Sequence, residues 1–299
     1  MSNVFNKVLF LTGGTGFIGT ELSKAWLSRS DRHKVVIQSR HPEKKRSNEK
    51  ISYVLNYADI EEPVFALVNL AGAPIADKRW SQSRKQELEN SRITLTRDLI
   101  EQVKKEEQCP HVFINASAIG FYGLGDEDKD EACEVGVGYA ASLCQRWELE
   151  ANEIAEFTRL AIARLGVVIG HGGVLKKLLP IYRMGLGGAI GDGSQWFSWI
   201  HMDDVVNAIL HIIDNKHMSG IYNLSSPNPV QQRDFASTLG KTLRRPTIIP
   251  TPSFLLSIGL GDMARELLLG GQKVLPTRLQ QAGYHFQHQY LDGALAASV

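Results

Sequence analysis

The sequence predicts an α/β protein in which a doubly wound parallel sheet is joined to a smaller C-terminal domain. Short apolar runs alternate with amphipathic segments, a glycine-rich turn follows the first run, and glycine and proline cluster beyond about residue 170. Such alternation is typical of a parallel sheet with helices on both faces. We expect residues 1–170 to form the main domain and residues 171–299 a smaller substrate-binding region, with a segment near 195–225 returning to the main domain.

The main domain is predicted element by element from these patterns. Residues 7–11, a glycine turn, residues 21–28 and residues 34–38 have the strand, turn, helix, strand pattern of a βαβ unit. Further strands are predicted at 65–70, 112–116 and 160–164, the last running into 166–170, and further helices at 81–107, with Ser81 as its N-cap, and at 139–157. The glycines between 185 and 193 and the later prolines indicate loops of a small domain over a ligand cleft.

Composition excludes several classes of protein. The 299 residues are 43% hydrophobic and 22% charged, which is ordinary for a globular chain and excludes a disordered or fibrous one. Lys and Arg total 33 against 32 Asp and Glu, so a nucleic-acid partner is not expected and an anionic ligand needs a local site. The sequence shows no signal peptide and no apolar stretch near the roughly 18 residues of a membrane span. We therefore expect a protein without a membrane partner that is cytoplasmic, or in an organelle matrix if a transit peptide has been removed.

The three cysteines, Cys109, Cys133 and Cys144, are too few and too scattered for a disulfide framework. None has C-x-x-C spacing, so the sequence predicts no metal site. Free thiols in a reducing compartment are the simplest interpretation.

The turn after the first strand fits a dinucleotide-binding fingerprint. Gly14-x-Gly16-x-x-Gly19 matches the general form, and Gly13-x-x-Gly16-x-x-Gly19 matches the spacing of short-chain dehydrogenases. Glycine permits the tight turn, the approach of backbone to a pyrophosphate and close packing of the helix, whose free amides then face the phosphates. The predicted contacts here are Gly13, Thr15, Gly16, Phe17, Ile18 and Gly19. The alternative is a structural turn that binds nothing.

The end of the second strand favours NADP(H) over NAD(H). An NAD site has an acidic residue there for the ribose 2′-hydroxyl, whereas this chain has Ser39 and Arg40. Arg40 can stack on adenine and pair with a 2′-phosphate, and Ser39 can bond the same phosphate. The alternative is an arginine that faces solvent. Five other residues are predicted to complete the cofactor cleft: Asp59, Leu70, Ala71, Gly72 and Val167. Arg79 is predicted either to contact a phosphate or to be a solvated surface charge.

Several segments resemble the extended short-chain dehydrogenase/reductase family. They are residues 12–19, 69–72, 117–123 and 199–205, to which residues 73–80, 185–188 and 268–276 add a narrower resemblance to the atypical YfcH-type, nucleotide-sugar-epimerase-like branch. The resemblance covers essentially the whole chain. It implies a Rossmann-type domain, a small C-terminal domain and NADP binding, without fixing a substrate, and it leaves a homodimer open.

The resemblance also implies catalytic residues, and this chain departs from them. The family uses a Ser or Thr, a Tyr and a Lys, with Tyr and Lys spaced Y-x-x-x-K, and the Lys lowers the pKa of the Tyr. Tyr139 matches the Tyr, but Leu143 stands where the Lys is expected. Ala118 stands where the hydroxyl is expected, with Ser117 one place earlier. The candidate catalytic residues are therefore Tyr139 and Ser117, with a packing role for Tyr139 as the alternative.

Two further positions are considered for this site. Arg146 is either a substitute for the missing cation or a surface arginine. His201 is either a general base or a structural residue, and Asp203 and Asp204 are expected to cap a helix that starts near Val205.

Two functions remain open at this point. The first is an NADP(H)-dependent oxidoreductase or epimerase with a degenerate Ser-Tyr-Lys triad, acting on a nucleotide sugar or another small carbonyl or hydroxyl compound. The second is a non-catalytic NADP(H)-binding sensor or interaction protein, which the residues Leu143 and Ala118 suggest.

Overall fold

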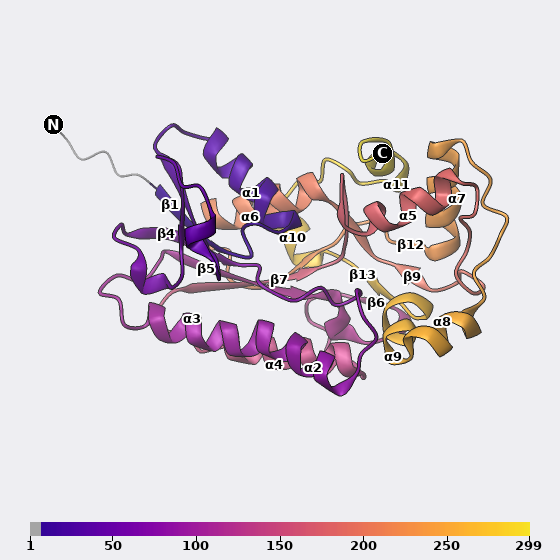
Figure 1. Cartoon of the computed structure of the whole chain (residues 1–299), viewed down its shortest axis with the longest axis horizontal. Helices are drawn as coiled ribbons and strands as arrows, with labels where there is room; N and C mark the ends of the chain where they lie inside the picture. The colour runs from indigo at the N-terminus through magenta and orange to yellow at the C-terminus, as the bar shows by residue number, and fades with distance from the viewer. Residues whose placement is uncertain (1–6) are drawn as a thin grey trace.

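A seven-stranded parallel sheet forms the centre of the computed structural model, which describes residues 7–299 (Figure 1). Its strands are β1 (Lys7–Thr12), β2 (His33–Gln38), β3 (Ile51–Val54), β4 (Val64–Asn69), β5 (Val112–Ala118), β7 (Arg159–Leu165) and β11 (Gly220–Leu224). They lie in the order β11-β7-β5-β4-β1-β2-β3, and every neighbouring pair is parallel. The predicted fold class, a doubly wound parallel sheet, is confirmed.

Helices cover both faces of this sheet (Figure 1). One face carries α1 (Phe17–Ser28) and α6 (Met202–Asp214), and the other carries α2 (Gln82–Glu89), α3 (Leu95–Val103) and α4 (Tyr139–Asn152). The helix expected over 81–107 runs without a break from Gln82 to Val103, as α2 and α3 with a π-helical turn between them, η3 (Asn90–Thr94). Among residues 7–299, no helix is both long and apolar enough to cross a membrane.

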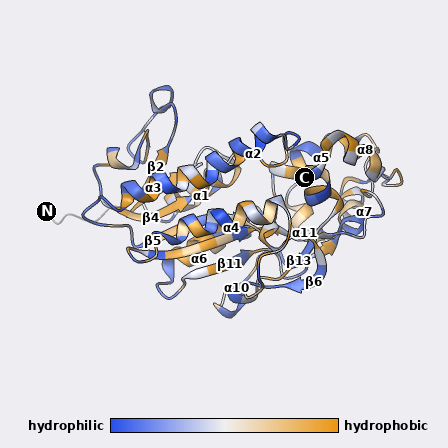
Figure 2. Ribbon diagram, turned by 90° about the horizontal axis from the view of Figure 1, so that it is seen from below, coloured by the Kyte–Doolittle hydropathy of each residue, from blue (hydrophilic) through white to orange (hydrophobic). Residues whose placement is uncertain are grey.

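Alternate side chains of each strand enter two separate cores, one on each face of the sheet. Leu9 and Leu11 of β1 pack with α1 and α6, whereas Val8 and Phe10 pack with α3 and the end of α4. All four side chains are fully buried. This explains why the strands are continuous apolar runs in the sequence, and Figure 2 shows the hydrophobic strands between helices with hydrophilic outer faces.

The strand order reverses between β1 and β4. From β1 the chain proceeds to β2 and β3 on one side, and from β4 to β5, β7 and β11 on the other. The carboxyl ends of β1 and β4 are in register at Thr12 and Asn69. In open parallel sheets this reversal point opens a crevice at the carboxyl edge, where ligands bind.

Most of the remaining elements lie beyond the carboxyl edge of the sheet, on the right in Figure 1, whereas α10 packs beside β11. The helices are α5 (Gly173–Arg183), α7 (Gln232–Leu243), α8 (Ser253–Leu260), α9 (Asp262–Ala264), α10 (Thr277–Gln281) and α11 (Leu291–Ala296); the strands are β6 (Gly125–Lys129), β8 (Val167–Ile169), β9 (Trp196–Phe197), β10 (Trp199–His201), β12 (Val230–Gln231) and β13 (Gln272–Val274). Single turns are η1 (Pro42–Lys44), η2 (Tyr57–Asp59), η4 (Ile119–Tyr122) and η5 (Arg265–Leu269).

The C-terminal part of the chain contacts elements from earlier in the sequence. β13, close to the C-terminus, pairs with β6 from the first half of the chain, and β11 extends the main sheet beside β7. The buried carboxylate of Asp204 on α6 accepts the backbone N–H groups of Gln287 and His288 at 2.8 and 2.9 Å. The last part of the chain is therefore held by pairing with β6 and by the carboxylate of Asp204 on α6.

Candidate functional site

The glycine turn between β1 and α1 is packed so tightly that two of its positions exclude any side chain. Gly13 has a φ of +64°, and a Cβ there would lie 2.7 Å from the carbonyl oxygen of Leu70. A Cβ on Gly19 would lie 2.5 Å from the carbonyl oxygen of Gly13. These two glycines let β4 and the first turn of α1 approach the turn closely.

The start of α1 presents unpaired backbone donors. Its N-cap, Gly16, supplies no side-chain hydrogen bond, and the first turn contains no acidic residue. Within residues 7–299, no acceptor bonds the amides of Phe17 and Ile18, while Thr15 and Gly16 are exposed. Free amides at the positive end of a helix dipole form an anion-binding site.

The wall opposite this turn is fixed by buried polar side chains. The Thr12 hydroxyl donates to Asn69 and accepts the N–H of Ala71 at 3.1 Å. Asn69 in turn donates to Thr96 and to Asn115 at 2.8 and 2.6 Å. These bonds hold the segment of Leu70 and Ala71 against the glycine turn, so the two predicted segments do meet.

Arg92, which no sequence pattern singled out, lies under this wall. A Cβ on Gly72 would be 3.0 Å from the Arg92 guanidinium, which donates to the carbonyl of Ala73 at 3.0 Å and stacks over Trp147. Burial lowers the pKa of Arg92 below its usual value. The absence of a side chain at Gly72 thus makes room for the Arg92 guanidinium beside the segment that follows β4.

The end of β2 carries a cation and no acid. Arg40 is exposed and pairs with no carboxylate within the described residues, and the Ser39 hydroxyl accepts the N–H of His41 at 3.2 Å. Asp59 lies on the exposed turn η2, where its carboxylate accepts the N–H of Asn56 at 2.8 Å. Asp59 therefore has a capping contact of its own.

Two other predicted residues lie near the C-terminal elements. A Cβ on Gly261 would be 3.3 Å from Nε of Arg79, so this exposed arginine lies beside the junction of α8 and α9. Val167 is half-buried in β8 opposite Trp199. The loop that follows β8 packs its glycines, including Gly172, on the ring of Phe17 at the start of α1.

Tyr139 is the first residue of α4. Its hydroxyl donates to the carbonyl of Lys85 at 3.0 Å, and its ring packs edge-on against Trp80 with centroids 5.0 Å apart. Burial, with a smaller contribution from Glu89, raises the pKa of Tyr139 to about 12. The phenol therefore keeps its proton at neutral pH.

The start of α4 is capped from far away in the chain. The Glu266 carboxylate on η5 accepts the backbone N–H groups of Tyr139 and Ala140 at 3.0 and 2.8 Å. An anion at this end of the helix satisfies two orphan donors and complements the dipole. Glu266 therefore positions the residue that matches the family tyrosine, a contact that no local sequence signal predicts.

Leu143, which replaces the expected lysine, is buried in a hydrophobic cluster. It is 1% exposed and belongs to a cluster with Trp80, Leu88, Ala140 and Met263. Arg146, one turn further on, donates twice to Glu89 at 3.1 and 2.8 Å on the surface. The nearby cations Arg146, Arg92 and Arg84 lower the pKa of Tyr139, but not enough to overcome its burial.

Ser117 belongs to a buried ionic network. Its hydroxyl donates to Glu148 at 2.6 Å, and Glu148 accepts two bonds from Arg164, at 2.8 and 2.7 Å. Arg164 also donates to the hydroxyl of Tyr122, which donates to Asn223 on β11. In this arrangement the Ser117 hydroxyl uses its proton in a hydrogen bond to the buried Glu148 carboxylate.

The segment at His201 differs from the expectation for Asp203 and Asp204. Helix α6 begins at Met202, and its N-cap is His201, whose Nδ1 accepts the Asp203 N–H at 3.2 Å. Asp203 and Asp204 lie in the first turn and are not its cap. The expectation was wrong because an imidazole nitrogen can accept the same bond as the usual oxygen of an Asp or Ser cap.

Comparison with known proteins identifies the family. Residues 9–225 match the model described as the NAD dependent epimerase/dehydratase family, and residues 251–298 match a domain of unknown function, DUF1731.

The chain belongs to the NAD dependent epimerase/dehydratase family. The resemblance to extended short-chain dehydrogenases is thereby confirmed. The "epimerase family protein SDR39U1 homolog, chloroplastic" of Arabidopsis thaliana is 37% identical, over 96% of this chain and 85% of that protein. The "epimerase family protein ML0860" of Mycobacterium leprae is also 37% identical, over 97% of this chain and 94% of that protein.

A solved structure of this family has nearly the same architecture. The human epimerase family protein SDR39U1 (isoform 2), crystallised with NADPH, is 30% identical with a TM-score of 0.88, over 97% of this chain and 98% of that one. A UDP-glucuronic acid 4-epimerase from Bacillus cereus, 16% identical with a TM-score of 0.78 over 97% of each chain, shows the shared fold alone.

The first prediction concerns Leu143, which stands where the family pattern has a lysine. Leu143→Lys should lower the free energy of unfolding by about 3 kcal/mol, because an ammonium would be buried without a partner. Urea denaturation followed by circular dichroism measures this change. Leu149→Lys is the control, since Leu149 lies on the same helix and is 61% exposed. Equal stability of the two variants would contradict the prediction.

The buried network gives a second prediction. Arg164→Leu should lower the free energy of unfolding by about 3–5 kcal/mol, because Glu148 would remain buried and uncompensated. The double variant Arg164→Leu/Glu148→Leu should recover most of that loss, since no charge is then stranded. Denaturation of both variants tests this, and a double variant no more stable than the single one would show that the charge is not the cause.

Proposed function

We propose that this chain is an NADP(H)-dependent oxidoreductase or epimerase that acts on a small carbonyl or hydroxyl compound, with a nucleotide sugar as the first class to test. The observation that carries the proposal is the glycine turn, whose unpaired amides lie near a strand end that bears Arg40 and no acid. The NADPH in the similar human structure supports the same choice of cofactor.

The residues present fit a phosphorylated dinucleotide. The amides of Phe17 and Ile18 would hold the pyrophosphate, because Gly13 and Gly19 leave the turn free of side chains. Arg40 and Ser39 would hold the 2′-phosphate, and the segment of Leu70 and Ala71 would form the opposite wall. When bound, NADP(H) supplies hydride-transfer chemistry.

Tyr139 is proposed as the proton donor. Its pKa of about 12 keeps the phenol protonated, and its hydroxyl already donates to the Lys85 carbonyl, so its proton is held at a defined atom. Without a lysine at position 143, little phenolate forms at neutral pH. We therefore propose that Tyr139 serves as a slow acid, and that Ser117 acts only through its bond to Glu148.

The substrate, a homodimeric state and a cytoplasmic location remain predictions. Cys109, Cys133 and Cys144 are free thiols, in keeping with a reducing compartment.

Arg40→Ala tests the choice of cofactor. This variant should bind NADPH about tenfold to a hundredfold more weakly while NADH binding stays unchanged, because only NADPH carries the 2′-phosphate. Isothermal titration calorimetry measures both affinities. Arg32→Ala is the control, since Arg32 is an exposed arginine just before β2. Equal losses for NADPH and NADH would remove Arg40 from phosphate recognition.

Tyr139→Phe tests the catalytic proposal. NADPH oxidation is followed with a panel of carbonyl compounds and nucleotide sugars, and kcat on any accepted substrate should fall about a hundredfold or more. NADPH affinity should not change, and the exposed Tyr290→Phe should behave as the parent chain. An unchanged kcat would exclude Tyr139 as the acid, and no turnover by the parent chain on the whole panel would favour the non-catalytic sensor.

A further inference from the structure

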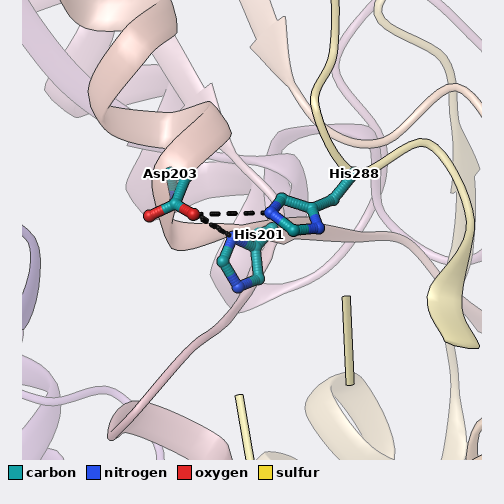
Figure 3. A group of neighbouring side chains, drawn as sticks. All are labelled: His201, Asp203 and His288. Carbon is teal, nitrogen blue, oxygen red and sulfur yellow. Dashed lines mark hydrogen bonds and ion pairs between the residues drawn. The ribbon is translucent and has the colours of Figure 1, made fainter. Parts of the chain in front are cut away.

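A cluster outside the proposed dinucleotide site brings together His201, Asp203 and His288 (Figure 3). His201 is the last residue of β10, Asp203 is in the first turn of α6, and His288 precedes α11. One ligand atom from each residue lies within 4.8 Å of the other two. We propose that these three side chains bind a divalent transition metal of the Zn²⁺ class.

The separations of the ligand atoms suit such an ion. Oδ2 of Asp203 lies 3.4 Å from Nδ1 of His201 and 3.4 Å from Nε2 of His288. Bonds of about 2.0–2.1 Å from Zn²⁺ to nitrogen and oxygen, at tetrahedral angles, place neighbouring ligand atoms about 3.3–3.4 Å apart. Two of the three separations between ligand atoms are therefore close to those of such a site, and the two imidazole rings lie side by side with centroids 3.9 Å apart.

The hydrogen bonds of His201 leave the lone pair on the correct nitrogen. The Ser298 hydroxyl donates its single proton to the carbonyl of Ala294 at 2.7 Å. It must therefore accept from Nε2 of His201, 3.1 Å away, which makes Nε2 the protonated nitrogen. Nδ1 is then the unprotonated nitrogen. Its lone pair accepts the Asp203 N–H at 3.2 Å, and a bound ion would take the place of that N–H. A partner that fixes the tautomer of a histidine in this way is typical of metal ligands.

One side of the cluster is open to solvent, and on the other side the neighbouring polar groups are hydrogen-bonded within the protein. His201 is buried, His288 is partly exposed and Asp203 is 56% exposed at its side chain, so an ion has an entry path and water can complete its coordination. The adjacent Asp204 is committed to the backbone of Gln287 and His288. Two imidazoles and one carboxylate favour Zn²⁺, Co²⁺ or Ni²⁺ over Mg²⁺ or Ca²⁺, which prefer oxygen.

The cysteine spacing indicates no metal site, and no local pattern reveals this one, because His288 is far along the chain from His201 and Asp203. The ion would join the segment before α11 to the β10–α6 corner. Binding to the folded state alone should then raise the melting temperature.

The test is calorimetric titration of Zn²⁺ into the full chain after treatment with a chelator. We expect one saturable site and a rise in melting temperature. His288→Gln and Asp203→Asn should each weaken binding about tenfold or more, whereas His285→Gln, at an exposed histidine three residues away, should not. Co²⁺ should give the visible absorption of a four-coordinate site in the parent chain and lose it in His288→Gln. Absence of saturable binding, or binding that both ligand variants retain, would overturn the proposal.

Discussion

The close approach of the first turn to the neighbouring strand is the constraint on which the rest of this structure depends. Gly13 can sit against the Leu70 carbonyl only because it lacks a side chain, and the Thr12 hydroxyl bridges the ends of β1 and β4. This contact lies where the strand order reverses and brings the free amides of α1 beside the end of β4. A side chain at Gly13 or Gly19 would separate these parts before affecting any ligand.

Most of the sheet and the cofactor turn could be predicted from the sequence, because their signals are local. Buried parallel strands are continuous apolar runs, and the turn needs glycines at fixed spacing. Contacts made by partners distant in sequence could not be predicted. The pair of Glu148 and Arg164, the capping of α4 by Glu266 and the pairing of β13 with β6 have no local pattern, since each side chain or strand alone is unremarkable in the sequence.

The departure at position 143 is accommodated by its surroundings. A buried lysine there would need a polar partner, but Leu143 packs in a hydrophobic cluster that includes Trp80 and Met263. The chain compensates for the missing cation neither with Arg146, which is paired with Glu89, nor with Arg92, which bonds backbone carbonyls. The substitution is thus part of a consistently packed cluster.

The capping of α4 by Glu266 connects the far end of the chain to the helix that carries Tyr139. Because β13 also pairs with β6, and Asp204 holds the backbone beyond residue 286, the two halves share their boundaries at three separate places. The dinucleotide-binding half is consequently not a detachable module. Exchanging the C-terminal portion would also remove the anion that caps α4, and would thereby change what positions Tyr139.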